Sequence, residues 1–454
     1  MTERLLVIGG DAAGMSAAAE ARRRLPASEL DVIAYERGGY TSYSACGLPY
    51  LVADRIHDPR DLVARTPEEH RANGIGMRTR HEVVSVDTQE RAITVRDLEA
   101  GSERREHFDA LVIATGAVPV RPKLPGVDTD GVHGIQTITD GVALRDHVSS
   151  HRHANQRAVV VGAGYIGLEM AEALHQRGMP VTVVEGAAQP MSTLDPDMGA
   201  LVGDAVRSLG IELRTSTKVV GFEADGNGHV RAVVTEDGTL PADVVVLGIG
   251  VRPNVALARD AGIAIGDKGG IATDARMTTS VDGVWAAGDC IETHHRVTGS
   301  PALVALGTHA NKQGRVAGEN ATGGDATFAG VIGTATTKVC AYEIGRTGLT
   351  EREASEARFD YVTARIESTT RAHYYPGSQP ITVKVVVQRG SGRLLGAQII
   401  GKEGAAKRID VLATAIWAEM TVDEVAQLDL GYAPPFSPVW DPVLIAARKA
   451  AHLV

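Results

Sequence analysis

Cysteine is scarce in this chain. Only three occur among 454 residues, at Cys46, Cys290 and Cys340. Three thiols in a chain of this length do not make a disulfide framework, so we expect a reduced, cytoplasmic setting. No set of histidine, cysteine and carboxylate residues has the spacing of metal ligands either, and we predict no metal site.

The sequence also lacks an excess of positive charge and any long apolar run. Lys and Arg number 46 against 56 Asp and Glu, a formal net charge of −10, which disfavours broad binding to nucleic acid or to an anionic membrane. No apolar run approaches the roughly 20 residues that a membrane helix needs. A strand begins almost at once, at Arg4, so we expect no signal peptide. The length predicts two or three domains.

Two segments share the order strand, glycine turn, helix and strand. The first runs from the strand Leu5–Ile8 to Glu36, and the second from the strand Ala158–Val161 to Glu185. Short β-branched runs that alternate with helices predict doubly wound, Rossmann-like α/β domains with parallel sheets. Glycines in such turns let a pyrophosphate approach the helix N-terminus, and the closing acid accepts hydrogen bonds from an adenosine ribose. Two copies therefore predict two dinucleotide sites.

The two predicted sites differ in detail. Asp11 replaces the middle glycine of the first turn, whereas the second turn keeps all three glycines. No Arg or Lys occurs at positions 186–189, directly after Glu185, and this favours NADH over NADPH. Asp289 ends a later strand and suits the ribityl hydroxyls of a flavin. The candidate cofactor-binding residues are Gly9, Asp11, Ala12, Ala13, Gly14, Glu36, Arg37, Ser42, Thr115, Gly116, Asp289 and Ala305, together with Gly162, Gly164, Tyr165, Ile166, Gly167, Glu185 and Gly250.

Cys46 lies in the run Tyr40–Tyr50, shortly after the first glycine unit, where a thiol is placed to reach a flavin bound to that unit. A dithiol reductase needs a second cysteine five residues on, and that position is Leu51. A single thiol beside a flavin indicates chemistry through a mixed disulfide, a persulfide or a sulfenic acid. The alternative is a buried structural thiol.

The pattern changes from about Ala329. Two apolar runs, 381–387 and 394–400, are separated by turn residues and followed by a helix with apolar spacing from Ile409 to Trp417. This predicts a third, α+β domain that forms an oligomer interface. The chain is expected to leave the first domain, build the second as an insertion and return. The predicted boundaries are 1–112 with 250–328 for the first domain, 113–249 for the second and 329–454 for the third.

In these motifs the chain resembles the pyridine nucleotide–disulfide oxidoreductases, and within them the single-cysteine branch of CoA-disulfide reductases, NADH oxidases and NADH peroxidases. The resemblance covers essentially the whole sequence. It implies FAD in the first domain, NADH or NADPH in the second and a homodimer formed through the third. The motifs that carry it are Gly9–Gly14, Glu36, Ser42, Cys46, Leu48–Tyr50, Ala114–Gly116, Gly162–Gly167, Ala287–Asp289, Lys338, Thr347–Thr350, Tyr374–Gly377 and Tyr432–Ser437.

The resemblance also implies an active site that is shared between subunits. Tyr374 and Tyr432 of one subunit would face Cys46 of the other, where a phenol orients or protonates a leaving thiolate. Tyr375 is a possible substitute for Tyr374. The alternative for both residues is an ordinary interface tyrosine, a common residue at interfaces.

The substrate site follows from the same resemblance. CoA-disulfide reductases present arginines on the first helix for the CoA nucleotide. Arg22, Arg23 and Arg24 occupy that place, with Arg23 and Arg24 as the candidate ligands and Arg24 matching best by spacing. The alternative is a solvated helix end whose cations suit the helix dipole. Ser42 matches a serine that lines the thiol substrate site.

A missing histidine helps to separate the branches of the family. NADH peroxidases and water-forming oxidases carry one in the first glycine turn, where this chain has Ala12. The leading hypothesis is therefore an NAD(P)H-dependent reductase of CoA disulfide, or of a related persulfide or polysulfide, acting through a mixed disulfide of Cys46. The alternatives are an NADH oxidase that reduces O2 or peroxide through a Cys46 sulfenic acid, and a ferredoxin or rubredoxin reductase that does not need Cys46.

Overall fold

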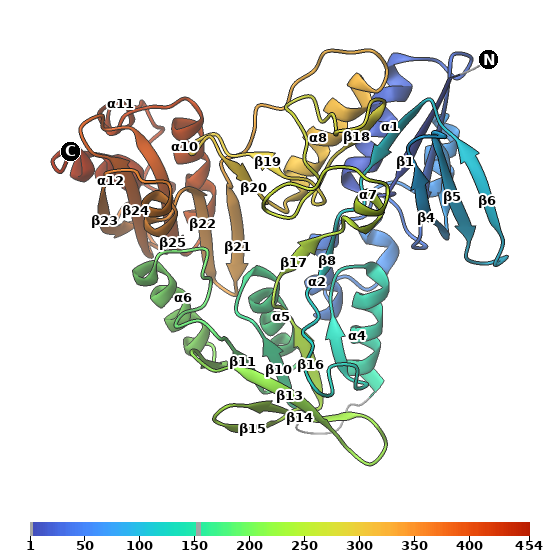
Figure 1. Cartoon of the computed structure of the whole chain (residues 1–454). Helices are drawn as coiled ribbons and strands as arrows, with labels where there is room; N and C mark the ends of the chain where they lie inside the picture. The colour runs from blue at the N-terminus through green and yellow to red at the C-terminus, as the bar shows by residue number, and fades with distance from the viewer. Residues whose placement is uncertain (1–2, 151–155) are drawn as a thin grey trace.

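The computed structural model describes residues 3–150 and 156–454. They form three lobes, each built around its own sheet (Figure 1), and the two ends of the chain lie in different lobes. No helix among these residues is long and apolar enough to cross a membrane.

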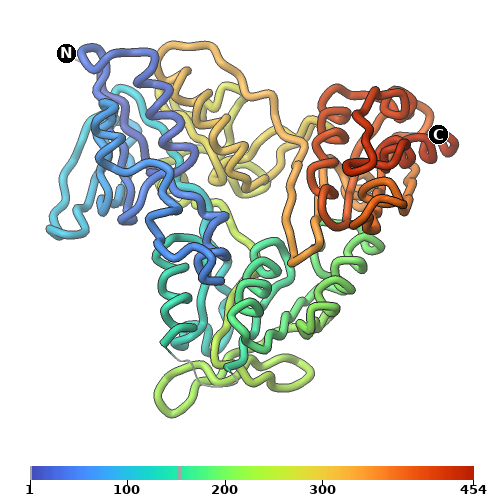
Figure 2. Tube along the Cα trace, turned by 180° about the vertical axis from the view of Figure 1, so that it is seen from behind, coloured from blue at the N-terminus to red at the C-terminus, as the bar shows by residue number. Residues whose placement is uncertain are grey.

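The first lobe contains a parallel five-stranded sheet with the order β18-β7-β1-β2-β3. Helix α1 (Ala12–Arg24) follows β1 directly and packs against α8 (Gly307–Asn320), and the two lie side by side when the molecule is seen from behind (Figure 2). An antiparallel sheet of β4, β5 and β6 adds to this lobe. The strands are β1 (Glu3–Ile8), β2 (Leu30–Glu36), β3 (Gly76–Thr79), β4 (His81–Asp87), β5 (Ala92–Asp97), β6 (Glu103–His107), β7 (Ala110–Ile113) and β18 (Val284–Ala286).

The second lobe repeats this plan with a parallel sheet of order β12-β11-β10-β16-β9, and a small antiparallel sheet of β13, β14 and β15 is inserted between β12 and β16 in the chain. Its helices are α4 (Ile138–Ser150), α5 (Tyr165–Gln176) and α6 (Pro196–Ser208). The two predicted strand–turn–helix units are therefore confirmed as Rossmann-like cores. The strands are β9 (Val132–Gly134), β10 (Ala158–Val161), β11 (Val181–Val184), β12 (Glu212–Arg214), β13 (Val219–Ala224), β14 (Val230–Thr235), β15 (Gly238–Pro241) and β16 (Val244–Leu247).

The chain passes between these lobes along an antiparallel pair, β8 (Ala117–Pro119) and β17 (Val251–Pro253). Strand β18, which follows the second lobe in sequence, pairs with β7 of the first sheet. We propose this pair as the place where the first domain gives way to the second and is joined again.

The third lobe is α+β, as predicted, with an antiparallel sheet of order β21-β22-β25-β24-β23. Helix α10 (Ala405–Trp417) packs on β22 and β25, and α12 (Pro442–Ala451) packs on β23 and β24. One detail differs from the predicted apolar spacing of α10. Trp417 is 44% exposed and does not join the core, and the guanidinium carbon of Arg296 lies 4.1 Å from the centre of its ring. The remaining elements are β21 (Ala335–Val339), β22 (Tyr342–Gly348), β23 (Tyr361–Thr369), β24 (Pro380–Gln388), β25 (Leu394–Gly401), α9 (Glu351–Glu356) and α11 (Val422–Ala426).

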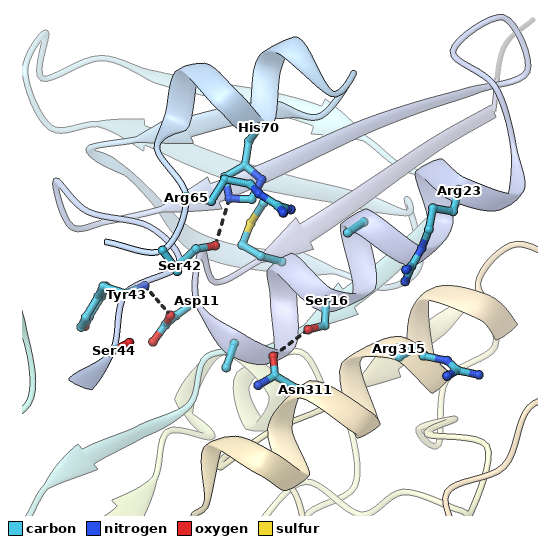
Figure 3. A pocket seen from close by; sticks show the side chains of 14 residues that line it. Asp11, Ser16, Arg23, Ser42, Tyr43, Ser44, Arg65, His70, Asn311 and Arg315 are labelled. Atoms are coloured by element: carbon cyan, nitrogen blue, oxygen red, sulfur yellow. Dashed lines mark hydrogen bonds between the residues drawn. The ribbon is translucent and has the colours of Figure 1, made fainter. Parts of the chain in front are cut away.

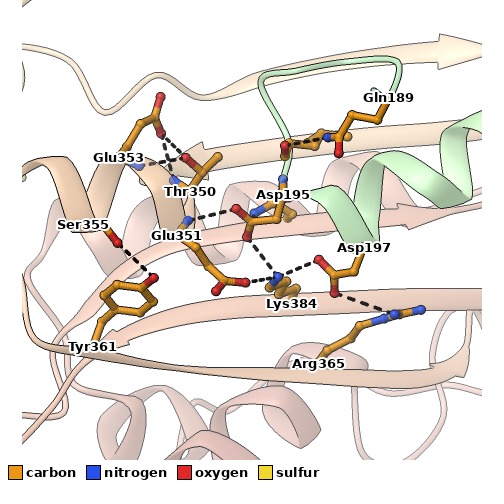
Figure 4. Close-up of polar contacts among 12 residues, drawn as sticks. Gln189, Asp195, Asp197, Thr350, Glu351, Glu353, Ser355, Tyr361, Arg365 and Lys384 are labelled. Atoms are coloured by element: carbon orange, nitrogen blue, oxygen red, sulfur yellow. Dashed lines mark hydrogen bonds and ion pairs between the residues drawn. The ribbon is translucent and has the colours of Figure 1, made fainter. Parts of the chain in front are cut away.

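A buried lysine joins the second lobe to the third (Figure 4). Lys384 on β24 is 4% exposed, and its ammonium lies 3.1 Å from Asp195, 2.6 Å from Asp197 and in hydrogen-bond contact with Glu351. Burial acts against the charge of Lys384, but its hydrogen bonds with Asp197 and Glu351 raise the pKa overall. These are the three carboxylates among the described residues that converge as metal ligands would. The ammonium already supplies the positive charge that such a cluster requires.

Candidate functional site

A cavity of about 620 Å³ follows the glycine turn of the first lobe. It extends from the carboxyl end of β1 past the ends of β2 and β7, the sheet edge at which dinucleotides bind in doubly wound folds. Asp289, on the segment after β18, closes one side, and burial raises the pKa of its carboxyl to about 6. The predicted cofactor residues that line the cavity are Gly9, Asp11, Glu36, Arg37, Thr115, Gly116 and Asp289.

The two glycine turns need glycine for a steric reason. A Cβ on Gly9 would lie 2.1 Å from the carbonyl oxygen of Ala114, and one on Gly162 would lie 2.4 Å from that of Gly248. Both glycines also have positive φ, +114° and +100°, where side chains are strained. Each turn can therefore pass under a neighbouring strand end only without a side chain.

The closing acids of the two units make the same contacts. Each carboxylate accepts one hydrogen bond from an amide of the glycine turn and one from the amide two residues after itself. These amides belong to Gly10 (2.9 Å) and Gly38 (2.6 Å) for Glu36, and to Ala163 (2.7 Å) and Ala187 (2.8 Å) for Glu185. Because a carboxylate accepts about four hydrogen bonds, both acids keep capacity for ribose hydroxyls. The residues present thus fit FAD at the first turn and a nicotinamide dinucleotide at the second.

The other predicted cofactor residues fall into three groups. Ala13 and Gly14 are buried where α1 begins, so they serve the packing of the turn, while Ala305 is exposed before α8 and lines neither of the cavities described here. Ala12 and Ser42 line a second cavity. At the second turn, the end of β10, the start of α5 and the segment after β16 carry Gly162, Gly164, Tyr165, Ile166, Gly167 and Gly250.

The second cavity, of about 440 Å³, lies beside the first, and Asp11 and Tyr43 line both. In Figure 3 its wall has Ser42, Tyr43 and Ser44 at one end and two arginines at the other, with Arg65 between them. Burial is the main cause that raises the pKa of Asp11 to about 6. The cationic residues of the wall are Arg23 on α1, Arg65 on the loop after η2 (Pro59–Leu62) and Arg315 on α8.

The three arginines of α1 separate into different roles. Arg22 donates hydrogen bonds to the backbone carbonyls of Gly74, Leu25 and Leu30 and so fixes local structure. Arg24, which the spacing favoured as a substrate ligand, does not line the cavity. Its guanidinium is bound instead by Glu319 and Thr322 of the α8 region. Arg23 lines the cavity and is paired with Glu20, and we propose it, in place of Arg24, as the residue that meets the substrate.

Cys46 is exposed and lies in a short turn, η1 (Ala45–Gly47), directly before α2 (Leu48–Val52). The apolar side of α2 is inserted into the hydrophobic core of the second lobe through Leu48, Leu51 and Val52. Leu51, which stands where a dithiol reductase has its second cysteine, is completely buried there. The segment that carries Cys46 is therefore anchored between the two dinucleotide domains.

The groups of the single chain around Cys46 disfavour its thiolate. Partial desolvation of the sulfur and the carboxylate charge of Glu169 raise the pKa of the thiol. Glu169 is on α5, accepts a hydrogen bond of 2.6 Å from Thr337 and has a pKa that burial also raises. A lower pKa of Cys46 therefore requires positive charge or hydrogen-bond donors from outside the single chain.

The charge of Glu169 predicts a measurable change in thiol reactivity. In Glu169→Gln, the anion that disfavours the thiolate is gone, so the pKa of Cys46 falls and the thiolate fraction at pH 7 rises. We expect alkylation of Cys46 by iodoacetamide, followed on the peptide that contains Cys46, to become about two- to fivefold faster, less than the tenfold that a full pKa unit would give. Glu172→Gln, one turn along α5, is the control, because Glu172 binds the amide of Cys340 at 2.7 Å. An unchanged rate in Glu169→Gln would show that its charge does not reach the sulfur.

Tyr374 and Tyr432 lie together on the third lobe. A hydrogen bond with Tyr374 raises the pKa of Tyr432, and the two loops that carry them are joined where the amide of Ala372 donates to the carbonyl of Pro434 at 3.1 Å. Neither tyrosine lines the two cavities of its own chain. Their loops form an exposed apolar patch, of the kind that marks a protein interface, made of Tyr374, Tyr432, Phe436, Val439 and Trp440.

Comparison with known proteins gives the same picture of the whole chain. Residues 3–314 match the family model "Pyridine nucleotide-disulphide oxidoreductase" and residues 334–442 its dimerisation domain. The chain is 39% identical over 450 residues to the NAD(P)H coenzyme A polysulfide/persulfide reductase of Pyrococcus horikoshii, covering 99% of this chain and 98% of that protein. The structure of a NAD-dependent persulfide reductase from A. fulgidus, 40% identical, superposes with a TM-score of 0.95 and covers 99% of this chain and 83% of that one.

Other relatives have names that point to related reactions. Coenzyme A disulfide reductase of Staphylococcus haemolyticus is 29% identical over 452 residues, covering 99% of this chain and 100% of that protein. A protein of Methanocaldococcus jannaschii named as an NADH oxidase is 38% identical over 452 residues, covering 98% of both chains. The whole chain, with its two dinucleotide units, single exposed cysteine and dimerisation domain, belongs to the pyridine nucleotide-disulphide oxidoreductase family.

Proposed function

We propose that the protein is an FAD-dependent NAD(P)H reductase of CoA disulfide, or of a CoA persulfide or polysulfide, acting through Cys46. The observation that carries this is the second cavity, which has arginines at one end and ends at Ser44, two residues before Cys46, at the other. A guanidinium binds phosphate oxygens through paired hydrogen bonds. A nucleotide thiol such as CoA therefore fits with its phosphates at the arginines and its sulfur toward Cys46. The relatives named as a coenzyme A disulfide reductase and as persulfide reductases support this choice.

The chemistry at Cys46 is a thiol–disulfide exchange. The Cys46 thiolate attacks one sulfur of CoA disulfide, which forms a Cys46–CoA disulfide and releases the other CoA as a thiolate. With a CoA persulfide the same attack releases hydrosulfide. Bound FAD supplies the electron pair, taken from the nicotinamide, that later reduces the mixed disulfide. A second chain completes the site in this proposal, with Tyr374 and Tyr432 of one subunit donating hydrogen bonds near Cys46 of the other.

The test is an anaerobic stopped-flow experiment on the FAD-loaded enzyme reduced with NADH. CoA disulfide and CoA persulfide should reoxidise the flavin within the time of one turnover, and glutathione disulfide, which lacks the nucleotide, should be at least about tenfold slower. Reoxidation only by O2 or peroxide would contradict the proposal. It would favour the second candidate, an NADH oxidase, which the similarity to a protein named as one supports. Ala12 argues against that candidate, because it lines the cavity without a proton donor.

We also propose that NADH is preferred over NADPH. The carboxylate of Glu185 is fixed toward the dinucleotide turn by two amides and would repel a 2′-phosphate. The nearest basic residue on the adjoining strand, Arg214, is bound to Glu212 at 2.8 Å. Glu185→Ala should therefore raise the KM for NADH about tenfold through lost hydrogen bonds, and it should lower the KM for NADPH because the repulsion of the 2′-phosphate is gone. The values of kcat/KM for both coenzymes check this, with Glu223→Ala, which removes a half-buried carboxylate paired with Arg231 on the small antiparallel sheet, as the control. An equal loss for both coenzymes would contradict the prediction.

A further inference from the structure

Ser42 has a backbone conformation that few residues other than glycine adopt. Its φ is +48°, in the left-handed region that costs a serine free energy. Two backbone hydrogen bonds keep Ser42 in this conformation. Its amide donates to the carbonyl of Gly10 at 2.9 Å, and its carbonyl accepts from the amide of Ala64 at 2.8 Å. The hydroxyl is thereby fixed at one point on the wall of the second cavity.

The partner of that hydroxyl is a buried histidine. His70 is 1% exposed, and its Nε2 lies 2.9 Å from Oγ of Ser42 (Figure 3). The histidine is carried on α3 (Pro67–Ala72), whose start is fixed by reciprocal hydrogen bonds between Thr66 and Glu69. Nδ1 of His70 is buried and makes no hydrogen bond with any described residue. Neither Ser42 nor His70 is therefore free to turn.

The protonation of His70 decides which way the serine hydroxyl points. Burial, and after it the charge of Arg65, lower the pKa of the imidazole, so it is neutral at neutral pH and carries one proton. On Nδ1 that proton would be a buried donor without an acceptor, which is costlier than a lone pair left unpaired. The proton therefore belongs on Nε2, which donates to Oγ of Ser42. The hydroxyl proton of Ser42 is then directed away from His70, into the cavity.

We propose that His70 is a positioning residue that holds the Ser42 hydroxyl as a hydrogen-bond donor to the thiolate released when Cys46 attacks its substrate, an inference that rests on the proposed function. The bond between Cys46 and one substrate sulfur forms as the substrate S–S bond breaks. The electron pair of that bond leaves on the second sulfur. Ser42 keeps its proton and donates a hydrogen bond to the departing thiolate, which solvent protonates afterwards.

The proposal predicts a dependence on the leaving group. A hydrogen bond to the departing sulfur helps most when that thiol is a poor leaving group, as CoA is, and least for a thiol of low pKa. Two substrates that present the same CoA moiety test this: CoA disulfide, and the mixed disulfide of CoA with thionitrobenzoate, an aryl thiol of low pKa. The measurement is the rate of the first thiol release by NADH-reduced holoenzyme in a single turnover.

Four variants separate positioning from packing. Ser42→Gly removes the hydroxyl and suits the positive φ, His70→Leu removes the donor, and His70→Gln restores an N–H near Nε2. We expect Ser42→Gly and His70→Leu to slow release of CoA about tenfold, release of thionitrobenzoate less than threefold, and His70→Gln to recover most of the loss. His107→Leu, on exposed β6, is the control for removal of a histidine.

Different results overturn different parts of the proposal. Equal slowing of both substrates in Ser42→Gly and His70→Leu would show a packing role and overturn the inference alone, as would unchanged release of CoA in both. If the wild-type enzyme releases CoA no faster than an unstructured cysteine peptide does, the proposed function fails and the inference fails with it.

Discussion

Replacing Cys46 with serine is expected to lower the reduction of CoA disulfide and CoA persulfide by at least about a thousandfold while leaving the reduction of bound flavin by NADH nearly unchanged. A serine hydroxyl cannot form the mixed disulfide, so the electron pair has no sulfur acceptor. The glycine turns that hold the dinucleotides do not involve Cys46, which lies in the separate turn before α2. The rate of flavin bleaching by NADH measures the reductive half-reaction, and thiol release from CoA disulfide measures the oxidative half-reaction.

A second cysteine, Cys340, provides the control for this experiment. Cys340 is half-buried at the turn between β21 and β22, and burial followed by the charge of Glu172 raises the pKa of its thiol to about 11. Cys340→Ser should therefore keep full activity. A Cys46→Ser enzyme that still reduced a small electron-transfer protein at the wild-type rate would favour a ferredoxin or rubredoxin reductase instead. One that lost only O2 or peroxide reduction would favour an oxidase that works through a sulfenic acid.

Local sequence patterns were enough to predict the fold of the two dinucleotide domains. Runs such as Val244–Leu247 and the glycine turns are signals contained in a few neighbouring residues, and the sheets form where those signals predict them. The absence of a second redox cysteine could also be predicted from the sequence, because Leu51 occupies the position five residues after Cys46. The structural role of Leu51 could not be predicted. Leu51 is packed into the core of a different domain, a contact that no local pattern records.

The substrate cavity shows where sequence patterns stop. Arg65, His70 and Arg315 were missed because they reach the cavity from a loop, from α3 and from α8, elements that meet α1 only in the folded chain. The arginines at the end of α1 were noticed, but no local pattern shows that Glu319 and Thr322 of the α8 region bind Arg24, the contacts that lead us to propose Arg23 instead. A charge pattern on a helix identifies candidates, and the packing partner selects among them.

If the active site is shared between subunits, as proposed, two inactive subunits should restore each other. Tyr374 and Tyr432 do not line the cavities of their own chain, yet they lie in an exposed apolar patch on a dimerisation domain. A doubly substituted Tyr374→Phe, Tyr432→Phe enzyme should lose about a hundredfold in activity if the phenols assist the leaving thiolate. The Cys46→Ser enzyme should be inactive for a different reason.

In a heterodimer of these two variants, one of the two sites would combine all the substitutions and the other would have none, provided that the tyrosines act across the interface. Heterodimers isolated with two different affinity tags should therefore recover about half of the wild-type activity per dimer. If each site were built within one chain, every site of the heterodimer would contain a damaging substitution, and no activity would return. The heterodimer is the same molecule under both hypotheses, so a change in its stability cannot by itself restore activity. Recovered activity therefore shows that one chain supplies the tyrosines to Cys46 of the other.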